Sequence, residues 1–84
     1  MSPHDIEQLI RASIAGVQVQ VESDDNTHFS ALIVSDEFAG KRTLQRHQQV
    51  YAALGTLMGN EIHALTMQTH TTEEWQALQQ AAQQ

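Results

Sequence analysis

Hydrophobic residues at the start of the chain recur with the spacing of a helix. Ile6, Ile10 and Ile14 are four residues apart, and this period places them on one face of an amphipathic helix. Ser2 has the hydroxyl of a helix cap, and Gly16 is a residue at which helices commonly end. We therefore expect the chain to open with a helix between these two positions.

The spacing then changes to the alternation that is typical of strands. Residues 17–22 alternate valine with polar side chains, which predicts a strand with one wet face. Residues 23–27 are polar turn formers, and residues 29–34 hold a near-continuous apolar run. The short link predicts a hairpin, and the apolar run favours a central strand that is covered on both faces.

A second helix is expected over residues 43–54. Leu44, Tyr51 and Leu54 share one face at helical spacing, so we expect this stripe to be the buried one. His47 falls on the same stripe, which favours a buried or half-buried structural histidine.

The remaining pattern predicts a short further turn, a third strand and a last helix. Residues 61–68 alternate, with Ile62 and His63 on opposite faces. A helical crossover separates this strand from the second one, which favours a parallel pairing. Thr71 and Glu74 match the capping box of a helix start. The order α-β-β-α-(α)-β-α predicts an α+β fold, a three-stranded mixed sheet packed with helices.

Composition limits the classes of function. A chain of 84 residues is expected to form one domain over residues 1–84, with 79–84 as a fraying helix end. It has no cysteine, so it cannot form a disulfide or bind a metal through a thiolate. A net charge of −6 argues against broad contact with phosphates. Neither a signal peptide nor a membrane-spanning run is visible, so we expect a cytoplasmic protein without a membrane contact.

Histidines are the main candidates for chemistry. The usual enzyme signatures are absent, and the carboxylates, which come in adjacent pairs, are expected to be solvated, so an independent enzyme is the weakest hypothesis. His4 and His70 lie near helix starts and are expected to be exposed. His28 ends the polar turn and His63 begins the third strand, where each can be a structural residue or a ligand. Two histidines alone do not make a strong metal site.

Four segments taken together resemble the BolA family. They are residues 34–41, 44–54, 62–65 and 72–75, and the similarity runs over residues 6–78. The combined pattern is specific, although no single segment is. The short, acidic, cysteine-free chain is most similar to the bacterial IbaG (YrbA) branch. The resemblance implies a class II KH-like fold, which agrees with the predicted element order.

The resemblance also implies a partner and a cofactor. BolA-type proteins share a [2Fe-2S] cluster with a monothiol glutaredoxin in a heterodimer, for cluster assembly, trafficking, or the response to iron, redox or acid stress. The glutaredoxin brings its cysteine and a bound glutathione thiol, and the family's C-terminal ligand histidine matches His63. Histidine replaces cysteine on one iron of Rieske centres. A chain without cysteine cannot hold such a cluster alone. Because histidine binds as neutral imidazole, acid should weaken the site.

The second ligand is less clearly marked in this sequence. Many relatives carry a cysteine or histidine in the loop between the first two strands, at a position that falls nearer Asp25 than His28. His28 is the one histidine in that region. Either His28 reaches the iron, or His63 is the only ligand from this chain and the cluster is correspondingly labile.

The basic residues suggest a docking surface. Lys41, Arg42 and Arg46 are three of the four basic residues of the chain. In KH domains the turn at this place contacts nucleic acid through a Gly-x-x-Gly signature, whose second glycine is missing in residues 40–43. A nucleic-acid-binding regulator is therefore the alternative, and we assign the three residues to docking of an acidic partner. For each of the three residues, an ordinary solvated position at the start of the helix is the alternative. We expect the free chain to be a monomer or a weak homodimer.

Overall fold

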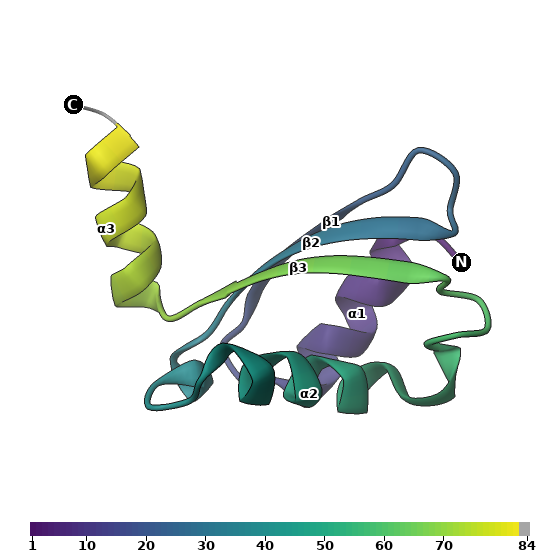
Figure 1. Ribbon diagram of the computed structural model, residues 1–84, viewed down its shortest axis with the longest axis horizontal. Helices are drawn as coiled ribbons and strands as arrows, with labels where there is room; N and C mark the ends of the chain where they lie inside the picture. Colours follow the sequence, from purple (N-terminus) through teal and green to yellow (C-terminus); the bar gives the residue numbers. More distant parts are fainter. Residues whose placement is uncertain (83–84) are drawn as a thin grey trace.

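The computed structural model describes residues 1–82, which form three helices and a three-stranded mixed sheet (Figure 1). The elements are α1 (Pro3–Ser13), β1 (Gln18–Glu22), β2 (His28–Val34), the 3-10 turn η1 (Asp36–Phe38), α2 (Thr43–Leu54), the 3-10 turn η2 (Gly55–Leu57), β3 (Ala64–His70) and α3 (Thr72–Ala82). The predicted α+β class is confirmed. Residues 79–82 continue α3, and the rest of the segment predicted to fray lies outside the described residues.

The sheet has the order β1-β2-β3, with β2 in the centre. β1 and β2 pair antiparallel as the predicted hairpin, and β2 and β3 pair parallel across the α2 crossover. The parallel register sets His28 beside Ala64 at one end of the strands and Val34 beside His70 at the other. This register decides which loop residues meet at each end of the sheet.

The hydrophobic core lies between one face of the sheet and the helices α1 and α2. Ile6 and Ile10 of α1 and Val50 of α2 are fully buried, and they pack with Phe29 and Ile33 of β2. The alternation of the strands places these inward side chains on one face, as their period of two requires. Burial of this apolar surface is the main stabilising term for so small a fold.

Two helices begin with reciprocal caps, of which the sequence predicted the one at Thr71 and, at the first helix, only the cap by Ser2. The Ser2 hydroxyl accepts from the backbone N–H of Asp5, and the Asp5 carboxylate accepts from the backbone N–H of Ser2. At the start of α3, Thr71 and Glu74 make the same exchange, at 2.9 and 3.2 Å. Each box satisfies two backbone donors that a helix start leaves free.

The buried face of α2 differs from the predicted one. Arg46, Val50 and Leu54 are its buried residues, whereas Leu44 is 67% and Tyr51 39% exposed. The prediction was right for Leu54 and wrong for Leu44 and Tyr51, because it treated Arg46 as a surface residue. Arg46 is instead buried and begins a row with Val50 and Leu54, each four residues further on. The helix is therefore rotated about its axis relative to the predicted orientation.

The third strand begins later than predicted. β3 starts at Ala64, and Ile62 lies in the preceding turn with its side chain fully buried. The turn is closed by the backbone: Ile62 N–H donates to the Leu57 carbonyl at 2.9 Å, and Gly59 N–H donates to the Ile62 carbonyl at 2.8 Å. Ile62 therefore anchors the turn in the core instead of extending the strand.

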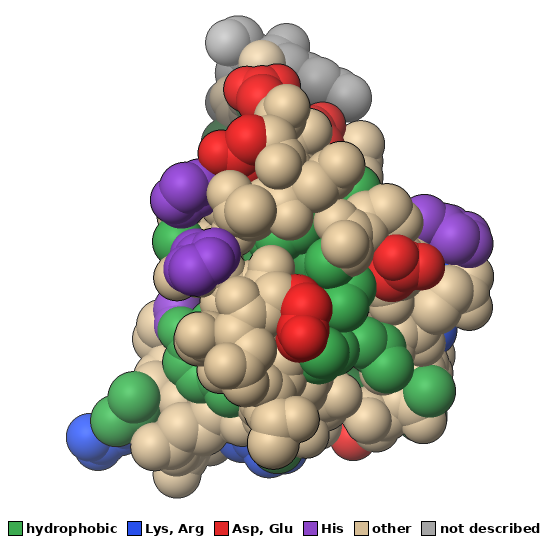
Figure 2. All heavy atoms as spheres, turned by 90° about the vertical axis from the view of Figure 1, so that its right-hand side faces the viewer, with side chains coloured by type: hydrophobic (Ala, Val, Ile, Leu, Met, Phe, Trp, Pro, Cys, Tyr) green, Lys and Arg blue, Asp and Glu red, His purple; other side chains and the backbone are tan. Residues whose placement is uncertain are grey.

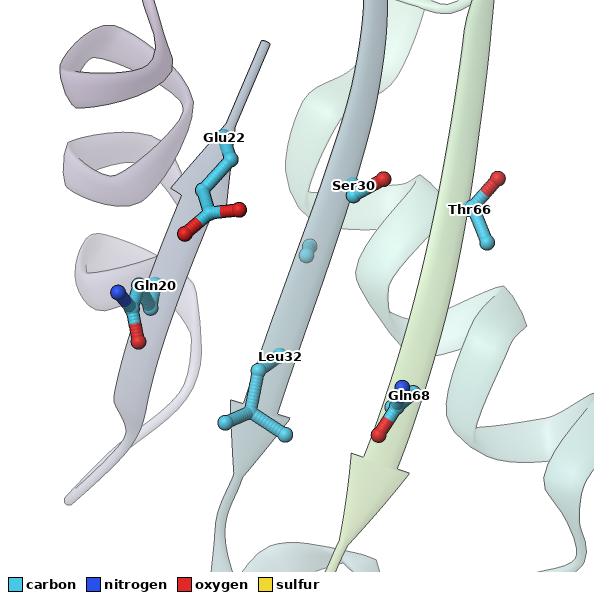
Figure 3. A pocket seen from close by; sticks show the side chains of 7 residues that line it. Gln20, Glu22, Ser30, Leu32, Thr66 and Gln68 are labelled. Carbon is cyan, nitrogen blue, oxygen red and sulfur yellow. The ribbon is translucent and has the colours of Figure 1, made fainter.

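The second face of the sheet is largely open, which corrects the expectation that β2 is covered on both sides. α3 stands away from the sheet at one end of the molecule (Figure 1), and none of its described residues is buried. A shallow depression on the open face is lined by Gln20, Glu22, Ser30, Ala31, Leu32, Thr66 and Gln68 (Figure 3). Within residues 1–82, none of the helices has the length and apolar content needed to span a bilayer.

Candidate metal centre

His28 and His63 lie side by side at the end of the sheet where β2 and β3 begin. The backbone N–H of His63 donates to the Thr27 carbonyl at 2.9 Å, and the two ring centroids are 6.5 Å apart. Both side chains are exposed. Figure 2 looks onto this end of the molecule and shows histidine side chains on both flanks, most of them on the left. The two residues that the sequence singled out are thus brought together.

The spacing of the two rings fits a shared metal ion. A histidine nitrogen binds a metal at about 2 Å. Because both rings are exposed, small side-chain rotations can bring a nitrogen of each to one ion from a centroid distance of 6.5 Å. Two imidazoles leave the other positions of a four-coordinate iron open. Within residues 1–82 no third histidine, aspartate or glutamate completes a site with them, and any thiolate ligand would have to come from another molecule, because the chain has no cysteine.

Asp25 holds the ring of His28. One carboxylate oxygen of Asp25 lies 2.7 Å from Nδ1 of His28, and the other accepts from the backbone N–H groups of Thr27 and His28 at 3.0 and 2.9 Å. The hydrogen bond from the His28 backbone, then those from its ring and from Thr27, lower the pKa of the Asp25 carboxyl. Nδ1 is thereby engaged, and Nε2 is the nitrogen available to a metal, as in the carboxylate–histidine pairs of many metal sites.

Sequence reasoning missed this role of Asp25, which was expected to be solvated. The signal was present in the loop, since an aspartate three residues before a histidine in a polar turn commonly accepts from the backbone that follows it. The loop is further fixed by Ser23, whose hydroxyl donates to the His28 carbonyl at 2.7 Å and accepts from the Asn26 N–H at 2.9 Å. Asn26 takes up the left-handed backbone conformation, with φ of 59°, which asparagine tolerates.

The other histidines are not part of this pair. His4 is exposed on α1, and His47 is half-buried on α2. His70 is half-buried and stacks on Trp75 with centroids 5.7 Å apart, so the expectation that it is exposed was wrong. The reason is that β3 extends to His70 and brings the ring under the start of α3. Among the described residues, no group of three or more histidine, aspartate or glutamate side chains could hold a metal ion.

The three basic residues that the sequence grouped together are in different environments. Lys41 and Arg42 are exposed. Arg46 is only 9% exposed, and its guanidinium donates to both oxygens of Glu74, at 2.7 and 3.1 Å. Hydrogen bonding from Arg46, more than from the Thr71 N–H, lowers the pKa of Glu74 to about 2. Glu74 is therefore not simply a solvated carboxylate, and Arg46 presents no free cation to a partner.

Comparison with known proteins assigns the family. The sequence model of the family described as BolA-like protein matches residues 10–74. The chain belongs to this family. The resemblance inferred from the sequence is confirmed at the level of the family, and the matches do not distinguish the IbaG branch within it.

Relatives in the BolA-like family resemble the chain in sequence and in structure. The "DNA-binding transcriptional regulator BolA" of Escherichia coli is 34% identical over 83 residues, which cover 88% of this chain and 79% of the relative. The protein of the same name from Vibrio cholerae is 42% identical over 60 residues, which cover 71% of this chain but only 57% of the relative. A solved BolA homologue from Coxiella burnetii superposes with a TM-score of 0.81 at 38% identity, covering 90% of this chain and 97% of that one.

Proposed function

We propose that this BolA-like protein is a non-catalytic partner of a monothiol glutaredoxin and shares a [2Fe-2S] cluster with it in a heterodimer. His63 is the main ligand from this chain and His28 the second. The glutaredoxin and its bound glutathione supply the thiolates. The cluster is cargo that the heterodimer assembles, passes on or senses.

The observation that carries this proposal is the exposed histidine pair. The ring centroids of His28 and His63 are 6.5 Å apart. His28 is the first residue of β2 and His63 directly precedes β3, and the parallel register sets these two strand starts side by side. Imidazole replaces thiolate on one iron of known two-iron clusters. Because the chain has no cysteine, sulfur ligands from a second protein complete the coordination. Membership of the BolA-like family supports the proposal as well, because the resemblance to this family implies a glutaredoxin partner and a shared cluster.

Each residue around the pair has a defined part in the proposed site. Asp25 engages Nδ1 of His28 and thereby directs Nε2 to the iron. Ile62, fully buried next to His63, fixes the backbone that carries the second ring. Acid would release the cluster, because an imidazole ligand must be neutral to bind. This property would suit a role in the response to acid stress.

Cluster reconstitution tests the proposal. The chain is mixed with a monothiol glutaredoxin, glutathione, iron and sulfide, and the visible absorbance and circular dichroism are compared with those of glutaredoxin alone. We expect a distinct heterodimer spectrum that His63→Ala abolishes and His28→Ala weakens. His4→Ala, an exposed histidine on α1, serves as the matched control and should leave the spectrum unchanged. A spectrum identical to that of glutaredoxin alone would exclude the proposal.

A regulator that binds nucleic acid is the second candidate. The specific observation in its favour is the name of the relatives from Escherichia coli and Vibrio cholerae, which are called DNA-binding transcriptional regulators, together with the exposed Lys41 and Arg42. The net charge of −6 and the engagement of Arg46 by Glu74 weigh against it. A salt-dependent mobility shift on duplex DNA that Lys41→Glu abolishes would favour this candidate over the first.

A further inference from the structure

β3 is an edge strand of the sheet, and half of its backbone groups point away from the rest of the sheet. The sheet order is β1-β2-β3, so β3 pairs with β2 alone. The Ala64 N–H donates to the carbonyl just before β2, and the His70 carbonyl accepts from the N–H just after β2. Backbone groups alternate in direction along a strand. The even residues of β3 therefore bond to β2, and the odd ones point outward, namely Leu65, Met67 and Thr69.

The two edges of the sheet differ in how the fold protects them. On the β1 edge, a carboxylate of α1 accepts from the Val21 N–H at 2.9 Å. On the β3 edge, the Thr69 carbonyl accepts from Arg46 at 3.2 Å, whereas the outward backbone groups of Leu65 and Met67 bond to no other residue within residues 1–82. In Figure 3 the helix α2 lies behind the sheet, and no strand lies beyond β3. The middle of β3 is therefore an open strand edge.

The sequence of β3 contains none of the residues that usually keep an open edge from pairing. Proteins discourage such pairing with charged side chains, proline or a bulge. Residues 64–70 contain no lysine, arginine, aspartate, glutamate or proline, and they pair with β2 continuously, without a bulge. The chain has a net charge of −6, but none of its carboxylates belongs to this strand. A second copy of β3 therefore brings no carboxylate against another at this edge.

An antiparallel copy of β3 fits this edge because the strand is complementary to itself. With a two-fold axis at Thr66, Leu65 lies opposite Met67 of the second copy, and the two residues exchange both of their outward hydrogen bonds. Leu65 and Met67 are half-buried and pack on the core side. Thr66 meets Thr66 of the second copy on the open face, a pair that stabilises strands. An axis at Met67 would instead need the Thr69 carbonyl, which Arg46 already engages.

We propose that β3 is a dimerisation edge, through which two copies of this chain join their sheets into one continuous sheet. The inference concerns the free chain and does not rest on the proposed function. The paired stretch, residues 64–68, is about 17 Å long. One strand pair of this length buries less than the surface of about 1,200 Å² that stable, specific interfaces bury at the least. The dimer is therefore reversible, and its population rises with protein concentration.

The Thr66→Cys variant tests the two-fold axis directly. Residues that face each other in a non-hydrogen-bonded antiparallel pair have Cα atoms about 4.5 Å apart, and a disulfide spans about 4.4–6.8 Å. The chain has no cysteine of its own, so this variant can form a disulfide only between copies. On oxidation in air it should give a covalent dimer about tenfold faster than Gln20→Cys. Gln20 is the matched control, exposed on the same face but on β1.

Sedimentation equilibrium measures the same contact without a cross-link. Wild type should show a dimer that grows with concentration. Thr66→Lys sets two like charges opposite each other at the axis and should weaken dimerisation by about tenfold or more, whereas Gln20→Lys should stay within about twofold of wild type. Equal cross-linking of the two cysteine variants, or a wild type that is monomeric up to about 1 mM, would overturn the proposal. A monomeric wild type whose affinity for glutaredoxin falls in Thr66→Lys would also overturn it and assign this edge to that partner.

Discussion

Replacing Arg46 by alanine tests whether this residue is part of the fold instead of a docking surface. Its guanidinium joins three segments of the chain. It donates to the carbonyl of Lys41 at 2.9 Å and to that of Thr69 at 3.2 Å, and it binds both carboxylate oxygens of Glu74. Since no described residue of α3 is buried, this contact is a main link between the start of α3 and the rest of the fold.

The expected loss of stability follows from these contacts. Glu74 has 46% of its side chain exposed, so solvent screens the ion pair, and the estimate rests on the two backbone carbonyls. At about 1 kcal/mol each, their loss destabilises Arg46→Ala by about 2 kcal/mol. In a domain of this size 1 kcal/mol shifts the melting temperature by about 4–8 °C, so we expect a decrease of about 8–16 °C.

Thermal unfolding followed by circular dichroism measures this decrease. Arg42→Ala is the matched control: Arg42 is exposed, and its backbone N–H, not its guanidinium, binds Gln45. It should change the free energy of unfolding by less than about 0.5 kcal/mol. Arg46→Lys keeps the charge but not the two-pronged geometry, so it should recover only part of the loss. If Arg46→Ala melts together with Arg42→Ala, the assigned role of Arg46 is incorrect.

Three further predictions concern pH, the candidate ligands and the core. The pKa of Glu74 is about 2 in the fold against an ordinary 4.5. Because the folded value is the lower one, the ionised Glu74 stabilises the fold above pH 4.5, and this stabilisation is lost as pH falls toward 2. In acid titrations of the stability of Glu74→Gln, this loss should be absent. Asp25→Asn removes the negative partner of the His28 ring, so the mixed cluster should decay about tenfold faster in the visible spectrum, with Asp24→Asn as the control. Ile62→Ala truncates a fully buried side chain and should cost about 3 kcal/mol in urea unfolding; a loss below 1 kcal/mol would contradict the role of Ile62 as the anchor of the turn.

Periodicity predicted most of the fold because it depends on local spacing. The isoleucines of α1, the alternating valines of β1 and the capping box of Thr71 each act within a few residues, and all are found in the structure. The parallel pairing of β2 and β3 follows from the helical crossover. Prediction failed where a distant contact decided the outcome. Arg46 is buried with its guanidinium donating to groups far along the chain, the Thr69 carbonyl and the Glu74 carboxylate, which local spacing does not reveal.

The candidate site was predictable in its residues but not in its geometry. His63 was identified by resemblance to a family, and His28 was the one histidine in its loop. Their proximity depends on the register of two strands that are separated by the whole of α2, which spacing along the chain does not encode. The contact of Asp25 with His28 could have been predicted from the sequence, because the two residues are only three positions apart in a polar turn.

Direct detection of nitrogen on the iron is the most decisive measurement for the proposed function. The chain is labelled with ¹⁵N-histidine and combined with unlabelled monothiol glutaredoxin and glutathione, and the reduced mixed cluster is studied by pulsed electron paramagnetic resonance. We predict a ¹⁵N coupling that disappears in His63→Ala, decreases in His28→Ala and is unchanged in His4→Ala. A cluster that shows no ¹⁵N coupling, or one whose coupling persists in His63→Ala, would contradict histidine ligation by this chain.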